Sequence, residues 1–254
     1  MPTIVHPGEL TPISCSLISV HAKYPTDLND ENVMWGISSL DNLSKKQKYE
    51  CLGRPKKVAL TDVWKQGELV TPVEVPELFL HTDTACLGDF GMAAKAGTDV
   101  RLRKLKPSPW NMLYHAPETF HNVIPGFASD MWSYMCLFAD LYLGFSPWGS
   151  SNTHVKMITR MVGILGPLPR HWRGYYTGYG ECDDSWYDQR RKCDRKVILE
   201  SIIKKERPEV SSVERDHVVE MMSKGFCYSP DGRPTATKLL RDSSFQAVME
   251  IYCR

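Results

Sequence analysis

Asp-Phe-Gly at residues 89–91, Ala-Pro-Glu at 116–118 and Ser-Asp-Met-Trp at 129–132 follow one another in this order in the middle of the chain. The third motif lies in a run over 128–143 that is apolar nearly all the way round a helix and is followed by Gly144. A helix without a polar face is buried at the centre of a domain, and a glycine commonly ends it. We therefore predict a central buried helix over this run, with the two tripeptides in the chain that leads up to it.

The rest of the chain is also predicted to be mainly α. Apolar spacing with start and stop residues predicts further helices over 12–22, 44–50, 152–164, 211–223 and 234–251. Gly166-Pro167 and Gly225 are stop signals, and Arg233-Pro234 is a start signal for the last helix. Residues 53–80 are punctuated by glycine and proline without a long period, which predicts a surface excursion that has no core of its own.

The composition is that of an ordinary folded protein. The chain has 254 residues, of which 42% are apolar and 24% charged, so it can form one large domain or two small ones. Its 31 basic and 30 acidic residues give a net charge of +1, which provides no global attraction to nucleic acid or to an anionic membrane. The basic run at 101–106 is either a solvated loop or a contact for phosphate or an acidic peptide.

The cysteines and the N-terminal residues indicate a compartment. The eight cysteines include no Cys-x-x-Cys pair, and Cys136 lies inside the most apolar helix, which is typical of intracellular thiols rather than of disulfides or a zinc site. Residues 1–7 show no basic region followed by an apolar core, and no segment approaches 18 continuous apolar residues. We expect an intracellular protein, in the cytoplasm or nucleus, with no signal peptide and no transmembrane segment.

Asp89 is the first candidate for chemistry. A carboxylate at the end of a strand can present oxygens to Mg²⁺, while Phe90 anchors the turn and Gly91 lets the backbone reverse. Alone, such a tripeptide is also an ordinary end of a strand. Followed by Tyr-His-Ala-Pro-Glu at 114–118 and by the central helix, however, the series resembles the eukaryotic protein kinase family, whose motifs require this order.

The resemblance covers about residues 12–252 and implies a protein-kinase-like α+β fold, represented by its mainly α C-terminal lobe (C-lobe). The expected organisation is a single, partial kinase domain over 1–254 without the β-sheet of the N-terminal lobe (N-lobe). Thr26, in place of the family's usual arginine, resembles the SR-protein-kinase-like branch of the CMGC kinases, fungal type. A long insert over 36–88 also resembles this branch. Residues 163–195 resemble the insert that CMGC kinases share.

Three charged residues have expected supporting roles. Glu118 lies near the apolar core and needs a basic partner, because an unpaired buried carboxylate is costly. The resemblance implies that Arg233 is this partner. Asp130, in the first turn of the central helix, is either a contact to the helix dipole or, as the resemblance implies, a side chain that reaches the backbone of the catalytic loop and holds it in place.

A phosphoryl-transfer site also needs an aspartate that orients the nucleophile and, five residues later, an asparagine for the metal. Pro-Thr-Asp-Leu-Asn-Asp-Glu-Asn at 25–32 places Asp27 and Asn32 at that spacing. His-Thr-Asp at 81–83 lies too close to Asp89 to leave room for the asparagine and the strands that must intervene. The resemblance implies Asp27 as the base, with Asn32 and Asp89 as Mg²⁺ ligands on the side that faces Mg·ATP.

Two departures keep a plainer alternative open, namely an Asp/Asn-rich turn. Pro25 stands in place of the family's histidine, and Asn29 in place of the lysine that contacts the transferring phosphate. The sequence also contains no Gly-x-Gly-x-x-Gly and no Val-Ala-x-Lys strand before Asp27, the groups that hold ATP in the family. We therefore expect weak or absent activity in this chain, as a fragment of a domain or as a C-lobe that is retained for binding.

The resemblance implies ATP-dependent phosphorylation of serine and threonine in protein or peptide substrates. The alternative is a non-catalytic, pseudokinase-like binding scaffold. A metal-dependent hydrolase that uses Asp27, Asp83 and Asp89 would leave the Ala-Pro-Glu motif unexplained. We expect a partner over the surface that faces the N-lobe in the family, and neither nucleic acid nor membrane as a partner.

Overall fold

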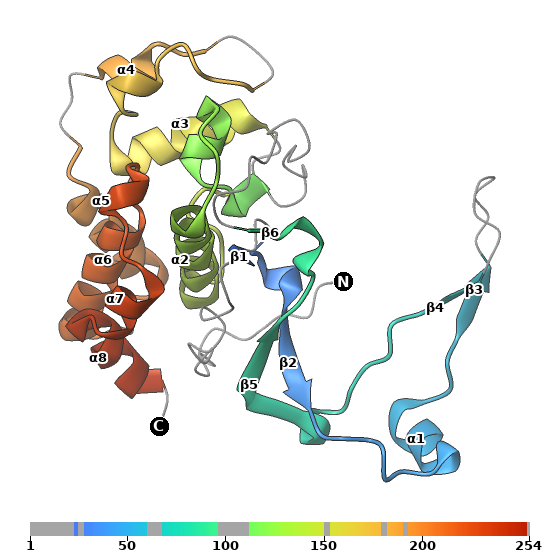
Figure 1. The fold of residues 1–254 in the computed structure, drawn as a ribbon. Helices are drawn as coiled ribbons and strands as arrows, with labels where there is room; N and C mark the ends of the chain where they lie inside the picture. The colour runs from blue at the N-terminus through green and yellow to red at the C-terminus, as the bar shows by residue number, and fades with distance from the viewer. Residues whose placement is uncertain are drawn as a thin grey trace.

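The computed structural model describes residues 23–24, 28–59, 68–95, 112–149, 153–178, 182–189 and 193–252. Its α-helices in these ranges are α1 Lys45–Leu52, α2 Phe127–Leu143, α3 His154–Leu165, α4 Ser185–Asp188, α5 Arg195–Glu206, α6 Ser212–Gly225, α7 Ala236–Leu240 and α8 Ser243–Tyr252. Its strands are β1 Lys23–Tyr24, β2 Val33–Ile37, β3 Lys57–Ala59, β4 Glu68–Val70, β5 Leu80–Leu87 and β6 Ala94–Lys95. Figure 1 shows the later helices gathered around α2, while the β2–β5 ribbon extends away from them and leads to α1, β3 and β4.

Helix α2 is the central helix that the sequence predicts. Most of its side chains are buried, among them Trp132, Met135 and Leu137. Gly144 follows it at φ 79°, and its N–H donates to the carbonyl oxygen of Asp140 at 2.8 Å. Glycine adopts this left-handed conformation without the steric cost of a Cβ, so the helix ends here. The predicted helix over 128–143 is confirmed.

Three other predicted helices are confirmed with shifts of one or two residues at their ends. Ser44 and Gln47 form a capping box that starts α1. The side chains of Thr153 and Ser211 accept backbone N–H groups at the start of α3 and α6. The predicted helix over 12–22 lies outside the described residues.

The single helix predicted over 234–251 is wrong, because two helices, α7 and α8, occupy this stretch. The carboxylate of Asp242 accepts the N–H groups of Ser244 at 3.0 Å and Phe245 at 3.3 Å, which starts a new helix. Thr235, rather than Arg233-Pro234, caps α7. Helices α4 and α5 were not predicted; only Leu199 and Ile203 of α5 are buried, too few to reveal a period.

The strands form three antiparallel pairs, β1–β6, β2–β5 and β3–β4. In the longest pair, Val33 lies opposite Leu87, and the register shifts between Trp35 and Gly36. The chain between β2 and β5 makes the predicted excursion. None of its described residues over 53–58 and 70–80 is buried, so these two parts of the excursion have no core of their own, as predicted.

The core lies among the helices of the C-terminal half. Trp132 of α2 stacks on Trp148 with ring centroids 5.5 Å apart, and Phe226 packs edge-on against both rings. The Nε1 of Trp148 donates to Cys136 Sγ at 3.2 Å. This aromatic cluster joins α2 to the end of α6 and so fixes the frame on which the preceding loops are held.

Gly225, the last residue of α6, is the site of a stability prediction. A Cβ there would lie 3.1 Å from Met135 Cβ and 2.7 Å from Met135 Cγ, atoms close to the α2 backbone that cannot move freely. We expect Gly225→Ala to lower the free energy of unfolding by about 1–3 kcal/mol through overpacking. Chemical denaturation measures this loss.

Gly163 of α3 is the matched control, since an added Cβ there meets nothing within 4 Å. Gly163→Ala should raise stability by up to about 1 kcal/mol through helix propensity. Equal effects of the two substitutions would show that α2 and α6 do not approach as closely as described.

Candidate functional site

Asp89 lies in a tight turn just after β5. Its backbone adopts φ 48° and ψ 69°, a left-handed conformation that aspartate tolerates better than most residues. Its Oδ1 accepts the N–H of Gly91 at 3.1 Å, and the N–H of Ala93 donates to the carbonyl of Phe90 at 3.0 Å. The carboxylate is exposed and so is accessible to a ligand from solvent.

The same turn places two supporting residues differently from their expected roles. Phe90, expected to anchor the turn, is 42% exposed, and the two hydrogen bonds around Asp89 hold the turn instead. Asp89 takes the left-handed conformation, whereas Gly91, which we expected to let the backbone reverse, does not. A Cβ at Gly91 would lie 3.0 Å from Asp89 Oδ1, so the glycine makes room for the carboxylate.

Asn32 lies beside this turn. It immediately precedes β2, and its carbonyl oxygen accepts the N–H of Gly88 at 2.8 Å. The next residues, Val33 and Leu87, are paired in the β2–β5 register. The fold therefore brings Asn32 and Asp89 to the same end of this strand pair. An amide and a carboxylate supply the oxygen ligands that Mg²⁺ prefers, so these two side chains fit the expected metal.

Asn29 has a local structural role. Its side chain is buried, and its Oδ1 accepts the N–H of Asn32 at 3.1 Å, which caps the short 3₁₀ helix Asp30–Asn32. The amide therefore holds the backbone that leads to Asn32. Pro25, Thr26 and Asp27 lie outside the described residues; Leu28, which follows them, packs against the core.

Among the described residues, no three His, Cys, Asp or Glu side chains come together as a metal site. No helix in the described ranges is long and apolar enough to cross a membrane.

Glu118 and Arg233 form a buried ion pair. Their side chains are 1% and 0% exposed, and two N–H···O contacts of 2.7 and 2.6 Å join them. The hydroxyl of Ser129 donates to the same carboxylate at 2.8 Å. The pair joins the 3₁₀ helix Pro117–His121 to the turn before α7. The structure therefore brings the two expected partners into contact, although they lie far apart in the sequence.

Asp130 is largely buried in the first turn of α2. Burial raises its pKa to about 9. Its Oδ2 has no hydrogen-bond partner within the part of the chain that the structure describes. A buried polar atom normally has a hydrogen-bond partner, and none of the described residues provides one for this oxygen.

Tyr114 and Asp140 form a contact that sequence reasoning missed. The Tyr114 hydroxyl donates to Asp140 Oδ2 at 3.1 Å, joining the segment before Ala-Pro-Glu to α2. Burial, with Asp140 and Asp30 nearby, raises the pKa of Tyr114, and burial raises that of Asp140. The sequence signal that could have revealed this contact is Asp140 itself, a carboxylate near the end of a helix that is otherwise almost entirely apolar.

His121 was also missed, because an isolated histidine carries no motif. It is buried, with Nδ1 2.9 Å from the carbonyl oxygen of Pro117 and Nε2 2.9 Å from the Tyr187 hydroxyl. The carbonyl can only accept, so Nδ1 donates and Nε2 accepts from the tyrosine. Its ring stacks on Trp172, with centroids 4.9 Å apart. This contact attaches the segment around 172–187 to the helix that begins at Pro117.

Burial lowers the pKa of His121, which sets a pH dependence. In the unfolded chain this histidine takes up a proton near pH 6.5, and in the folded chain it does so only at lower pH. The buried neutral imidazole therefore contributes fully to the free energy of unfolding above about pH 6.5, and this contribution is lost as the pH falls. Between pH 7.5 and 5 we expect the His121→Gln chain to lose less free energy of unfolding than the parent chain, because glutamine takes up no proton.

The exposed His171 is the matched control. Melting temperatures measured between pH 7.5 and 5 test this, and His171→Gln should alter their pH dependence less than His121→Gln does. A His121→Gln profile parallel to that of the parent chain would contradict the assignment of a buried neutral imidazole.

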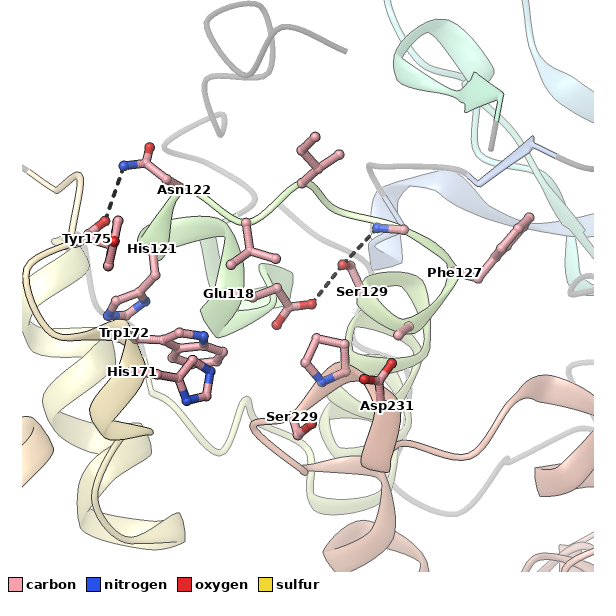
Figure 2. A pocket seen from close by; sticks show the side chains of 15 residues that line it. Glu118, His121, Asn122, Phe127, Ser129, His171, Trp172, Tyr175, Ser229 and Asp231 are labelled. Carbon is pink, nitrogen blue, oxygen red and sulfur yellow. Dashed lines mark hydrogen bonds between the residues drawn. The ribbon is translucent and has the colours of Figure 1, made fainter. Parts of the chain in front are cut away.

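An open pocket of about 1020 Å³ lies next to this contact, and His121 and Trp172 are among the residues that line it (Figure 2). Its walls come from the loop before α2, from the chain around Trp172 and Tyr175, and from the turn at Asp231. Neither Asn32 nor Asp89 lines it. The pocket is therefore distinct from the candidate metal site.

Comparison of the sequence with those of known proteins identifies relatives. Residues 77–245 match the family model described as "Protein kinase domain". The human "Dual specificity protein kinase CLK1" is 29% identical over 136 residues, which cover 52% of this chain and 28% of that protein, and mouse CLK1 gives the same identity and coverage. "Mitogen-activated protein kinase kinase kinase mkh1" of Cytospora mali is 22% identical over 191 residues, 74% of this chain and 8% of that protein. The chain thus spans less than a third of the length of each relative.

Proposed function

Because the chain belongs to the protein kinase domain family, we propose that it provides the metal side of a serine/threonine phosphoryl-transfer site. Asn32 and Asp89 would hold Mg²⁺, which when bound neutralises charge on the ATP phosphates. Asp27 would accept the proton of the substrate hydroxyl as it attacks. The substrates would be proteins or peptides.

One observation carries this proposal, namely the convergence of Asn32 and Asp89 at one end of the β2–β5 pair. The hydrogen bond from Gly88 N–H to the Asn32 carbonyl fixes their backbones together. The Asn29 cap holds the backbone of Asn32, and the hydrogen bond from Gly91 N–H holds the Asp89 carboxylate. Catalysis of phosphoryl transfer is mostly positioning and electrostatic stabilisation, so a rigid pair of oxygen ligands is what the reaction needs.

The supporting residues act at a distance from the metal. We propose that Asp130 holds the backbone of the catalytic loop that contains Asp27, through the oxygen that has no partner among the described residues. The Glu118–Arg233 pair holds the Ala-Pro-Glu segment against α2. These are positioning roles, and none of them requires contact with ATP.

We further propose that the protein belongs to the SR-protein-kinase-like branch of the CMGC kinases. Thr26, the insert over 36–88 and the CMGC-type insert over 163–195 support this assignment, and two of the relatives reported above are CLK1 proteins.

A specific observation favours the scaffold alternative. Asn29, in place of a lysine that contacts the transferring phosphate, is buried and occupied in capping the Asp30–Asn32 helix. It therefore offers no cation to the phosphate. Since the 254 residues also contain no Gly-x-Gly-x-x-Gly, we expect the chain to transfer phosphate slowly at most.

Phosphorylation of a serine/threonine peptide mixture by this chain with Mg·ATP tests the proposal. We expect slow transfer that Asp89→Asn abolishes, because asparagine keeps the acceptor for Gly91 N–H and tolerates the left-handed turn but removes the charge. Asp216→Asn, at an exposed carboxylate of α6, is the control and should leave the rate unchanged. Transfer that survives Asp89→Asn would refute the assigned metal ligand, and no transfer by the parent chain would favour the scaffold.

A further inference from the structure

Positive charge is concentrated in one segment of the excursion between β2 and β5. Residues 45–57 contain six basic residues and one acidic residue, which give a net charge of +5. The whole chain has a net charge of +1, so the remaining residues carry the difference, −4. The small global charge, from which we expected no nucleic acid as a partner, conceals this local concentration.

Helix α1 carries three of these cations, and its packing does not explain them. None of its side chains is buried. Lys45 and Lys48 are neighbours on the helix surface, where like charges repel. Lys45 and Lys46 also stand in the first turn, where the helix dipole favours acidic side chains and the sequence has none. The arrangement costs helix stability, which indicates that these lysines serve a role outside the fold.

The chain after α1 brings a further cation to the same place. Gly53 follows the helix at φ 74°, a conformation that glycine adopts without the steric cost of a Cβ. Beyond it, the Arg54 guanidinium lies 5.7 Å from the centroid of the Tyr49 ring, and Lys45 Nζ also lies 5.7 Å from that centroid. One aromatic ring therefore holds two cations from different segments close together.

Four of the cations form no ion pair with the described residues, and we call them the basic cluster: Lys45, Lys48, Arg54 and Lys56. Lys48 is partly exposed and the other three are exposed. In Figure 1, α1 and β3 lie apart from the helices gathered around α2. The cluster is therefore accessible to a large ligand.

The backbone of the cluster is held at both ends. The capping box of Ser44 and Gln47 fixes the start of α1. At the other end, the Lys56 carbonyl oxygen accepts the N–H of Thr71 at 2.9 Å and its hydroxyl at 3.3 Å. A ligand therefore meets cations whose backbone is already placed, so binding orders only their side chains.

The residue types indicate which anion the cluster suits. Arginine grips a single carboxylate or phosphate through two parallel hydrogen bonds, whereas lysine acts as a point charge. Three of the four cations are lysines, so the cluster suits an anion with many separate charges, such as the phosphate backbone of a nucleic acid. Because the cations come from a helix and from the chain that follows its glycine turn, a flexible single strand can follow them better than a rigid duplex.

We propose that the basic cluster binds the phosphate backbone of single-stranded nucleic acid without reading its sequence. It neutralises about four phosphates, one for each cation. This function goes beyond the proposed phosphoryl transfer and does not rest on it, because the cluster shares no residue with Asn32 or Asp89.

Fluorescence anisotropy of a labelled twelve-nucleotide oligouridine, titrated with this chain at several salt concentrations, tests the proposal. We expect the logarithm of the association constant to fall linearly with the logarithm of the salt concentration, with a slope of about −3 for four phosphates on a single strand. Affinity should therefore drop about fiftyfold between about 50 and 200 mM salt. The double variant Lys45→Gln/Lys48→Gln should halve the slope and weaken binding at least about tenfold at about 50 mM salt.

Two further double variants are the controls. Lys204→Gln/Lys205→Gln removes the same charge from exposed positions of α5 and should change affinity less than about twofold, which separates the cluster from the global charge. Lys45→Arg/Lys48→Arg keeps the charge and should also bind within about twofold of the parent chain. Glutamine and arginine propagate a helix about as well as lysine, so the melting temperatures should agree.

No binding by the parent chain at about 50 mM salt would overturn the proposal, as would equal losses from the two glutamine variants. Oligothymidine of the same length should bind like oligouridine, because the contacts are to phosphates, and a preference above about tenfold for either would contradict this. Equal or tighter binding of polyglutamate, or of vesicles that contain phosphatidylserine, would show an acidic protein or a membrane as the occupant and overturn the proposal. Asp89→Asn should leave binding unchanged, so failure here and failure of the proposed phosphoryl transfer are separable.

Discussion

Replacing Arg233 by alanine is expected to lower the free energy of unfolding by about 3–5 kcal/mol, because it leaves the Glu118 carboxylate buried without its partner. The guanidinium has five N–H donors, and all of them are used. The acceptors are Glu118 Oε1 and Oε2, Ala128 O, Cys227 O and Tyr228 O, at 2.6–3.1 Å. Removal of the side chain therefore leaves a buried charge and three partly buried carbonyl oxygens without their donor.

Two controls separate the network from charge alone. Arg233→Lys keeps the charge but cannot reproduce a fork of five donors, so it should restore only part of the stability. The exposed Arg241 is the matched surface control, and Arg241→Ala should change stability by less than about 0.5 kcal/mol. Denaturant titration measures all three variants. A loss for Arg233→Ala no larger than that for Arg241→Ala would contradict the buried pair.

Trp132→Ala is the second change with a large expected effect, a loss of about 3–5 kcal/mol. The ring is fully buried, stacks on Trp148 and meets Phe226 edge-on, so its removal leaves a cavity at the centre of the helical body. The Arg233 guanidinium lies 5.1 Å from its centroid, which adds a cation–π contact. Trp35 on β2, partly exposed, is the control, and Trp35→Ala should cost much less.

The two predictions are coupled. Because Trp132 and Arg233 are in contact, the loss in the double variant should differ from the sum of the single losses by about 0.5–3 kcal/mol. If the two losses were strictly additive, the aromatic cluster and the ion pair would act independently. That result would contradict the contact between Trp132 and Arg233.

The sequence predicts the helical frame where its signals are local. The apolar run of α2 and Gly144 define that helix, and Gly225 coincides with the last residue of α6. The sequence did not predict the division between α7 and α8, because the apolar spacing continues through it. A single side chain, Asp242, starts the second helix by capping it. Helix α5 escaped because most of its surface faces solvent.

The candidate site was predicted where a motif marks it. The resemblance implied Asn32 and Asp89 as metal ligands and Arg233 as the partner of Glu118. In the structure the first two lie at one end of the β2–β5 pair, and the last two form the buried ion pair. Asn29 could only be noted as a departure, because its capping role requires the backbone to be seen. His121 and its contact with Tyr187 depend on chain segments far apart in the sequence, which no local pattern reveals.

Paramagnetic relaxation is the most direct test of the central claim that Asn32 and Asp89 form the metal side of a kinase site. Mn²⁺ prefers the same oxygen ligands as Mg²⁺ and broadens nearby amide resonances when added with ATP. We predict broadening at Val33, Gly88 and Gly91 that disappears in Asp89→Asn and persists in Asp216→Asn. Broadening that is unchanged by Asp89→Asn, or that is centred on another carboxylate such as Asp231, would contradict the claim.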